Sequence, residues 1–198
     1  ASDVYKRQQK VGPSMADDIK NAAFLAVVFA MFCMAAYILL RFRDISFSVG
    51  AFASVAVTTL CIISFYTLLW KVLPFSMEVD QTFIAAILTI IGYSINDTVV
   101  VFDRIRETIG LYPKRDRYQV INDALNSTLS RTFNTSLTTL VVVLCIFILG
   151  GATIRSFTFA ILLGIIIGTY STLFVATPIA YELQKKKINK KAAAEAGK

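Results

Sequence analysis

The sequence predicts an all-α integral membrane protein with five transmembrane helices. Hydrophobic residues make up 56% of the 198 residues, above the roughly 45–50% that is typical of soluble domains. Five apolar segments approach the ~20 residues that a helix needs to cross a bilayer. They lie at about 21–40, 47–70, 83–102, 133–149 and 157–181. Because a spanning segment must satisfy its backbone hydrogen bonds internally, we expect helices despite the many β-branched residues.

The charged connections between these segments predict the topology. The net charge is +7, and most basic residues lie in three stretches, 41–46, 103–132 and 184–198. The other two connections carry only Lys71 and Arg155 as basic residues. The positive-inside rule then places the N-terminus outside and the basic tail 184–198 in the cytoplasm. Since no signal segment precedes the first span, we expect the chain to be the C-terminal part of a longer protein.

The composition excludes several classes of function. The chain has no histidine, so a triad that needs this residue is excluded. Its three cysteines, Cys33, Cys61 and Cys145, lie in apolar runs and form no metal-binding motif. The absence of a phosphate-binding GxxxxGK[ST] loop disfavours an ATPase, and a nucleic-acid site would need a soluble basic surface. We therefore expect no enzyme activity, no metal, no cofactor and no nucleic-acid partner.

Two segments outside the spans have their own character. Residues 1–10 are polar, and part of them reads as the translation of a sequencing adapter, so we leave them out of the functional argument. In the connection 103–132, apolar residues recur at three- and four-residue spacing, which indicates an amphipathic helix. It would lie along the membrane surface or act as an ordinary soluble connecting helix. The apolar residues are Tyr118, Ile121, Leu125 and Leu129.

Asp97 is the residue most indicative of function, because it lies within the apolar segment 83–102. A carboxylate at membrane depth costs about 2.5–3.5 kcal/mol on insertion scales, and such residues mark ion or proton pathways. Burial penalises its charged form and a nearby cation stabilises it, so a site that alternates between these conditions can move a proton. A structural hydrogen bond to a neighbouring helix is the alternative. Polar residues around it are Tyr93, Ser94, Asn96 and Thr98.

Arg131 is the predicted partner of Asp97, since it begins the next span near the same side of the membrane. One helix face continues from it with polar residues, which we expect to point into the bundle or toward water. These are Asn134, Thr135 and Thr138. The alternative is that Arg131 is a topology anchor whose side chain reaches the cytoplasmic interface.

Two further groups of residues have mainly structural interpretations. Asp103 and Arg104 follow Asp97 at the membrane boundary, where they indicate a solvated helix extension, with a role in guiding protons as the alternative. Gly164 and Gly168 form a GxxxG pattern that allows close helix packing in membranes. We expect the fifth span to lie in the bundle interior.

A longer stretch around Asp97 resembles a known family. Residues 92–107 read GYSINDTVVVFDRIRE, which closely resembles the signature of the SecF family of protein-export membrane subunits, within the resistance-nodulation-division superfamily. Residues 11–13, 131–139 and 164–171 also resemble this family, and the likeness extends over 11–183. Many members carry a His-Asp pair where this chain has Val57 and Thr58. The loop 74–80 resembles that of chains in which SecD and SecF are fused.

The resemblance implies a fold, a location and a role. Family members have six spans in the bacterial inner membrane and a periplasmic domain after the first, so this chain would hold the last five, most of one half of a resistance-nodulation-division-type bundle. The positions matching Asp97 and Arg131 would pass protons, with the proton as coupling ion. Proton flow would drive the export of a preprotein. The implied partners are SecD, separate or fused, the SecYEG channel, YajC, YidC and membrane lipid.

Two other functions stay open at this stage. One is a proton-driven exporter of small molecules or lipids from the same superfamily. The other is a structural subunit that stabilises the translocation channel without moving ions.

Overall fold

The computed structural model describes residues 13–73, 75 and 80–196 of the chain. The helices are α1 (Pro13–Phe42), α2 (Ile45–Leu69), α3 (Gln81–Leu111), α4 (Arg117–Leu149), α5 (Ala152–Ser171) and α6 (Thr177–Ala196), with a π-helical turn, η1 (Thr172–Ala176), between the last two. This described part contains no strand. The all-α prediction is confirmed. The interpretation of residues 1–10 lies outside the described residues.

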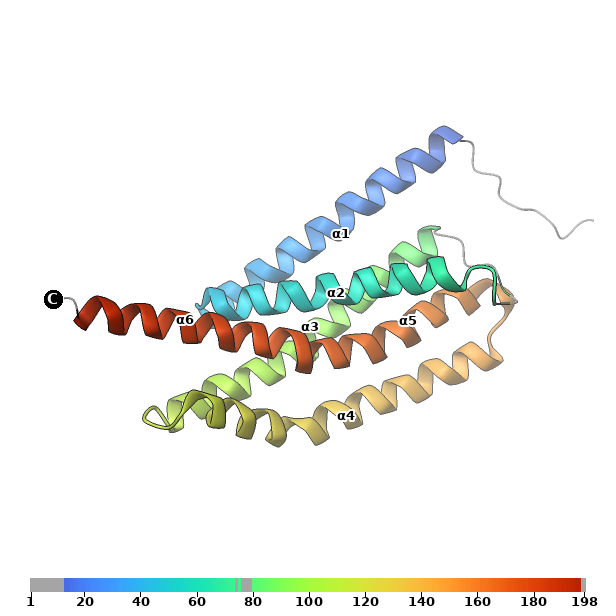
Figure 1. The fold of residues 1–198 in the computed structure, drawn as a ribbon. Coiled ribbons are helices and arrows are strands. Elements are labelled where there is room, and N and C mark those ends of the chain that lie inside the picture. The colour runs from blue at the N-terminus through green and yellow to red at the C-terminus, as the bar shows by residue number, and fades with distance from the viewer. Residues whose placement is uncertain (1–12, 74, 76–79, 197–198) are drawn as a thin grey trace, which may run out of the picture.

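Five stretches of helix are long and apolar enough to cross a membrane, by length and composition. They are Asn21–Phe42, Ile45–Leu69, Gln81–Leu111, Arg117–Leu149 and Ile154–Lys190. The five predicted spans are therefore confirmed, each within a helix that extends further. The last stretch joins α5, η1 and α6 into one continuous helix (Figure 1).

Aspartate side chains cap the N-termini of three of these helices. Asp44, Asp80 and Asp116 each accept a hydrogen bond from a backbone N–H in the first turn of α2, α3 and α4. Such caps satisfy backbone donors that have no partner inside the helix. Gly150 and Gly151 form the turn between α4 and α5.

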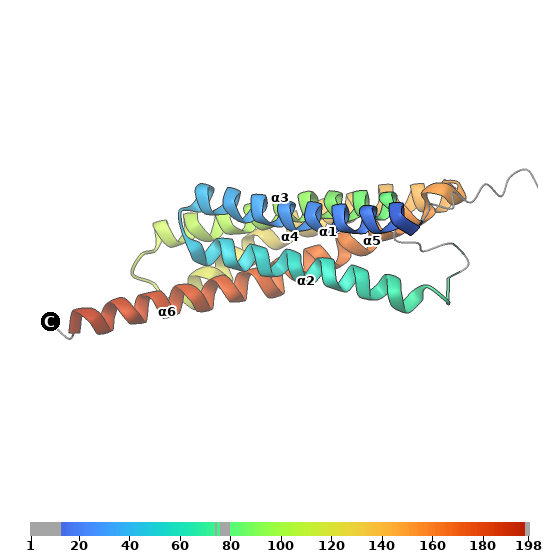
Figure 2. The ribbon, with the colours of Figure 1, turned by 90° about the horizontal axis from the view of Figure 1, so that it is seen from above.

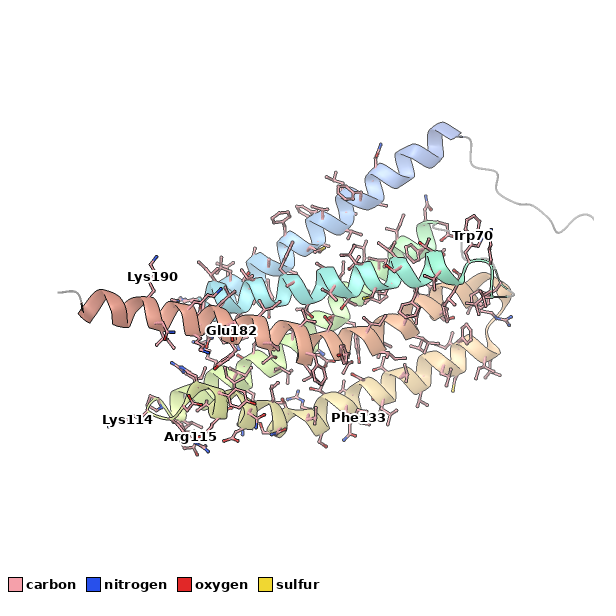
Figure 3. All side chains as sticks on the ribbon, viewed as in Figure 1. Trp70, Lys114, Arg115, Phe133, Glu182 and Lys190 are labelled. Atoms are coloured by element: carbon pink, nitrogen blue, oxygen red, sulfur yellow. The ribbon has the colours of Figure 1, made fainter. Side chains whose placement is uncertain are left out.

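The helices form one bundle with α1 at its edge. The half of α1 that ends at Phe42 packs on α2 and α3, and the N-terminal half diverges from the bundle (Figure 1). Helix α2 lies beside α6 in both ribbon views (Figure 2). Lys114, Arg115 and Lys190 lie toward one end of the bundle and Trp70 lies at the other (Figure 3). We call the first of these the basic end.

The connection 103–132 differs from the prediction. Helix α4 runs without interruption from Arg117 to Leu149, so the amphipathic segment and the fourth span form one helix and not a separate helix on the membrane surface. Together with the end of α3 it makes a helical hairpin at the basic end (Figure 1). Val120, Ile121 and Ala124 are buried in this hairpin, whereas Tyr118 and Leu129 are exposed. The packed face is thus rotated from the predicted one.

Glycines bring α5 against α3, as the GxxxG pattern predicts. A Cβ atom built on Gly164 would collide with the side chain of Ile90, and one on Gly168 would lie 3.5 Å from the Ser94 hydroxyl. Close approach of small residues is a common means of packing helices in membranes. This contact places α5 next to the polar face of α3 that carries Asp97.

Candidate functional site

Asp97 lies inside the bundle, midway along α3, with 6% of its surface exposed. The Ser136 hydroxyl of α4 donates a hydrogen bond to its carboxylate, over 3.3 Å. Ser136 also contacts the Thr169 hydroxyl of α5 at 2.7 Å. Because Ser136 has one hydrogen and gives it to Asp97, Thr169 must donate to Ser136 when Asp97 is ionised. Three helices thus supply a chain of two hydroxyls that ends at the carboxylate.

A second set of hydroxyl contacts lies beside this chain. Thr98, the residue after Asp97, donates to the carbonyl of Ser94 and contacts the Thr172 hydroxyl at 3.0 Å. On α2, the Ser54 hydroxyl contacts the Ser171 hydroxyl at 2.9 Å. The buried polar groups of α2, α3, α4, α5 and η1 therefore meet at one level of the bundle.

Two hydroxyls at this level have no hydrogen-bond partner among the described residues. They are the buried Oγ of Ser94 and Oγ1 of Thr132. A buried polar group without a partner costs about 1–3 kcal/mol, and such groups are few in native structures. Ser94 lies three residues before Asp97 on α3, and Thr132 lies one turn before Ser136 on α4.

The π turn η1 borders the same polar cluster. Pro178 lacks an N–H and would press on the carbonyl of Phe174 in a regular α-helix, so widening the preceding turn relieves that contact. The Thr177 hydroxyl donates to the Thr172 carbonyl, five residues earlier, over 3.2 Å. Helix α2 approaches closely here, since a Cβ on Gly50 would collide with the Ala176 carbonyl. Single π turns within α-helices are frequent at functional sites.

Arg131 does not pair with Asp97 in the described part of the chain. It is exposed and lies five residues before Ser136, or about 7.5 Å along the helix at 1.5 Å per residue. With Asp103, Arg104 and Glu107 it lines a cavity of about 700 Å³ at the basic end. The two predicted partners thus form no ion pair in this structure, and Asp97 has the Ser136 hydroxyl as its contact.

The polar face that begins at Arg131 is turned away from this bundle. The prediction gave two settings for this face, the bundle interior or water. In the described part of the chain the face is exposed, because α4 contacts α3 and α5 through a different face. The buried polar face of α4 begins one residue after Arg131 along the helix surface. It consists of Thr128, Thr132 and Ser136. The exposed polar residues of the predicted face are Asn134, Thr135 and Thr138.

The remaining predicted residues divide between the site and its surroundings. The Tyr93 hydroxyl donates to the Thr139 hydroxyl over 3.4 Å, and Asn96 is exposed. Asp103 pairs with Arg41 at 2.9 Å, because the end of α1 packs there. Arg104 pairs with Glu107 at 2.8 Å and donates to the Ser127 hydroxyl.

Thr58 occupies a position where the resemblance implies an acidic residue. Its hydroxyl is buried and donates to the Ser54 carbonyl over 2.9 Å, so it belongs to the hydroxyl cluster. Val57 is partly exposed on the outer side of α2. This chain therefore has a neutral hydroxyl at that point, and Asp97 is the one buried carboxylate among the described residues.

Sequence reasoning missed Ser136, Thr169 and Thr172 as contacts of the site. A signal for the last two was present, because hydroxyl residues cluster in 169–172 just before a proline in a predicted span. For Ser136 the signal was ambiguous, since polar residues occur on both faces of the same stretch of α4.

The family profile described as protein export membrane protein SecD/SecF, C-terminal, matches residues 2–186. The chain belongs to this SecD/SecF family. The match includes most of segment 1–10, whose interpretation as a partial artefact stays a prediction. The matched range includes the buried Asp97 and the stretch 92–107 around it.

Individual members of the SecD/SecF family are also similar over most of this chain. The protein translocase subunit SecF of Rhodothermus marinus is 48% identical over 176 residues, which cover 89% of this chain and 57% of that protein. The SecF subunit of Vibrio alginolyticus is 41% identical over 180 residues, covering 90% and 54%. This chain therefore spans little more than half the length of these relatives.

A solved structure supports the same fold. The crystal structure of SecDF in its super-membrane-facing form matches with a TM-score of 0.80 and 35% sequence identity. The match covers 93% of this chain and 24% of the SecDF chain. The arrangement of α1 to α6 is thus that of one part of a larger membrane protein in the SecD/SecF family.

Proposed function

We propose that this chain is the proton-coupled membrane part of an accessory subunit of the bacterial Sec translocase, which promotes the export of polypeptides. The observation that carries the proposal is the buried Asp97 at the end of a hydroxyl chain from α4 and α5. An ionisable side chain at membrane depth that faces the interior of the bundle is typical of a proton pathway. Membership of a protein-export family supplies the process to which the proton would be coupled.

The hydroxyls of Ser136 and Thr169 suit a group that gains and loses a proton. With Asp97 ionised, both hydroxyls point their hydrogens toward the carboxylate. With Asp97 protonated, its O–H can donate to Ser136 and the chain can reverse, because a hydroxyl both donates and accepts. Either charge state of Asp97 therefore keeps a hydrogen-bond partner, which lowers the cost of its burial.

Arg131 would act as the counter-charge in another state of the protein. Its cavity opens at the basic end, within about two helical turns of Ser136, and the side chain makes no ion pair with described residues. An arginine that moves toward Asp97 would favour the ionised carboxylate and release its proton. Retreat of the arginine would favour protonation. Alternation between these positions would couple the proton to a movement of α4.

The outward polar face of α4 suits a protein partner. Asn134 would otherwise face lipid, where an amide is unfavourable unless it is hydrogen-bonded. Its neighbours Thr135 and Thr138 already bond carbonyls of their own helix, so the amide is the group that needs a partner. We propose that SecD, separate or fused, covers this face and completes the bundle. The SecYEG channel, YajC, YidC and the moving preprotein would be further partners in the bacterial inner membrane, with the basic end in the cytoplasm.

The energy that one proton supplies in crossing the membrane is enough to drive a change of conformation. One proton crossing a potential of 100 mV supplies about 2.3 kcal/mol. This is enough to shift a two-state equilibrium by roughly fiftyfold, since 1.4 kcal/mol corresponds to a factor of ten. It is too little to unfold a stable protein in one step, so the coupling would act through repeated small movements.

The test compares a buried and an exposed carboxylate in the full-length protein. Asp97→Asn should abolish proton flux in membrane vesicles and proton-dependent export of a reporter preprotein, while the subunit still inserts and assembles. Asp123→Asn is the control, because Asp123 is an exposed residue of α4 that pairs with Arg115 and does not line the cavity of Arg131. It should leave flux and export near the wild-type level.

Other outcomes would favour the other functions. Unchanged proton flux in both Asp97→Asn and Arg131→Gln would support a structural subunit. Loss of flux together with normal protein export, and with loss of small-molecule or lipid efflux, would support an exporter of the same superfamily.

A further inference from the structure

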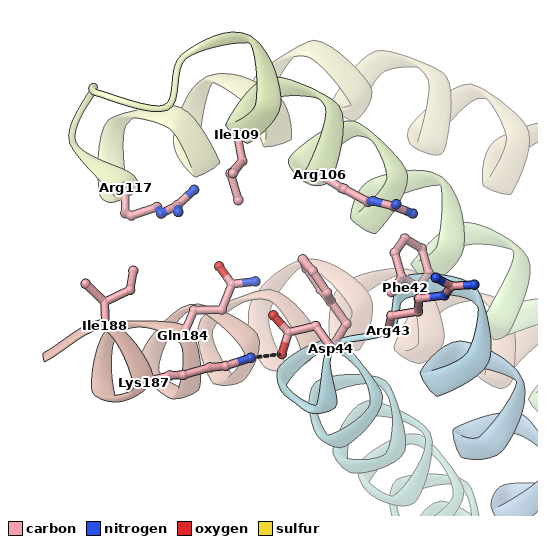
Figure 4. Close-up of a pocket in the computed structure, with 10 residues that line it drawn as sticks. Phe42, Arg43, Asp44, Arg106, Ile109, Arg117, Gln184, Lys187 and Ile188 are labelled. Carbon is pink, nitrogen blue, oxygen red and sulfur yellow. Dashed lines mark hydrogen bonds and ion pairs between the residues drawn. The ribbon is translucent and has the colours of Figure 1, made fainter. Parts of the chain in front are cut away.

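A second cavity lies at the basic end, away from Asp97. It has a volume of about 360 Å³, within the range of small-ligand pockets. Its walls come from the turn between α1 and α2, from α3, from the first residue of α4 and from α6 (Figure 4). Because the turn 43–44 joins the ends of two spans, the cavity lies at the level where a span leaves the membrane.

The cavity walls are strongly basic. Four lining residues are basic and one is acidic; the basic residues are Arg43, Arg106, Arg117 and Lys187. The acidic residue, Asp44, is already occupied: it caps α2 by accepting from the Ser46 N–H, and it pairs with Lys187 at 3.4 Å. Neither Arg43 nor Arg117 makes an ion pair with a described residue. The lining therefore has an excess of positive charge that an anion would neutralise.

Arg43 is held at this cavity in an unusual backbone conformation. Its φ is 53°, the only positive value of a non-glycine residue in the described part. Its N–H donates to the Leu39 carbonyl over 2.8 Å and so ends α1. Glycine is the usual residue at such helix ends. Strained conformations of this kind are typical of binding sites.

A buried amide and an aromatic floor complete the cavity. Gln184 is only 9% exposed, makes no side-chain hydrogen bond with described residues, and points from α6 into the space below Ile109 and Arg117 (Figure 4). Its NH₂ group is therefore free to donate. The rings of Phe42 and Phe47 line the cavity and pack together with a centroid distance of 5.3 Å.

We propose that this cavity binds the phosphate headgroup of an anionic membrane lipid. Arg117 and the Gln184 amide, which point into the cavity, would hold the phosphate, for which guanidinium groups are suited by geometry (Figure 4). Arg43 and Arg106 lie at its other side, where Arg106 donates to the Arg41 carbonyl over 3.4 Å, and would add positive charge. Basic pockets between transmembrane helices at the membrane boundary are typical sites for such headgroups. A soluble phosphate would use the charges but not the phenylalanine floor, which lies where the glycerol and the start of the acyl chains would rest. The lipid would join the α1–α2 turn to α3, α4 and α6.

The test is a lipid titration of the purified chain in detergent, followed by native mass spectrometry. Short-chain phosphatidylglycerol should bind, and phosphatidylcholine of the same chain length should bind much more weakly. Replacing Arg43, Arg106 and Arg117 (Arg43→Gly, Arg106→Gln and Arg117→Gln) should weaken phosphatidylglycerol binding about fivefold per residue, since each basic residue near a membrane surface contributes about 1 kcal/mol. Arg43→Gly is also tested alone, because glycine suits the backbone there and the variant should keep its fold.

A matched control removes three basic residues of the same end that do not line the cavity. Lys114→Gln, Lys185→Gln and Lys186→Gln together should leave the affinity within twofold of wild type. Equal loss in both triple variants would show general charge attraction and overturn the proposal. Equal binding of the two lipids would overturn it as well. Complete competition by inorganic phosphate at the same concentration would identify a soluble anion as the ligand and overturn the lipid assignment.

Discussion

Ser136 donates a hydrogen bond to Asp97 across the contact between α4 and α3, and the same hydroxyl meets Thr169 of α5. This relationship ties the one buried carboxylate of the described chain to two other helices. A change in the charge of Asp97 therefore alters hydrogen bonds that join three spans, which is the property that a proton-coupled movement requires.

Removing the Ser136 hydroxyl should lower the proton flux strongly and the stability of the fold only slightly. Ser136→Ala should lower the proton flux in vesicles, because the ionised Asp97 loses its donor and its link to Thr169. Interhelical hydrogen bonds in membranes average about 0.6 kcal/mol, so the free energy of unfolding in detergent should fall by about that amount. Thr135→Ala is the matched control, since that hydroxyl only bonds the carbonyl of Arg131 in its own helix. Equal flux in the two variants would contradict the assigned role of Ser136.

Enlarging Gly164 should disturb the contact between α5 and α3. Gly164→Val would press on Ile90, and overpacking a close contact costs about 1–3 kcal/mol. The expected result is a lower unfolding temperature in detergent and lower proton flux. The second change Ile90→Ala, made in the same chain, should restore part of both because it opens the space that the valine needs.

Gly92 provides the control for this experiment. A Cβ atom there has no neighbour within 4 Å, so Gly92→Ala should be tolerated. It should raise stability slightly, because alanine is favoured over glycine within a helix by roughly 0.5–1 kcal/mol. A strong loss of stability in Gly92→Ala would mean that the described packing of α3 is wrong.

Pro178 should maintain the π turn and, through it, the contact between Thr98 and Thr172. In a background without the three native cysteines, the pair Thr98→Cys and Thr172→Cys should form a disulfide on oxidation, because the two hydroxyl oxygens lie 3.0 Å apart. Adding Pro178→Ala should slow this reaction, since a regular α-helix would rotate the residues of η1. Rates would be followed by gel electrophoresis.

A pair before the π turn serves as the reference. Ser136→Cys with Thr169→Cys should crosslink at a rate that Pro178→Ala leaves unchanged, because both residues precede η1. If Pro178→Ala slowed both pairs equally, the effect would be a general loosening and not a local change of helix geometry.

The exposed ion pair between Arg41 and Asp103 should contribute little to stability. Both side chains are more than two-fifths exposed, and pairs of this kind are worth about 0–1 kcal/mol. Arg41→Gln should therefore change the free energy of unfolding by less than about 1 kcal/mol. A loss much above this value would show that the pair holds α1 against α3.

The sequence alone determined the class of the protein and its spans. Apolar length is a local property, and each spanning segment forms its own backbone hydrogen bonds, so the helices could be placed without tertiary information. Asp97 could be selected for a similar reason, because a carboxylate within an apolar span is recognised from the local sequence alone. Gly164 and Gly168 likewise indicated a close contact before the partner residue was known.

The residues that contact Asp97 could be identified only from the packing of the helices. Along α4 two faces carry polar residues, one through Arg131 and Asn134 and the other through Thr132 and Ser136, and the sequence predicted the first. The structure buries the second, because α5 approaches α3 at its glycines and presents Thr169 where α4 must pack. Helix rotation depends on side chains from distant parts of the chain, which no local pattern contains. The π turn before Pro178 and the joining of the amphipathic segment to the fourth span depend on the same packing.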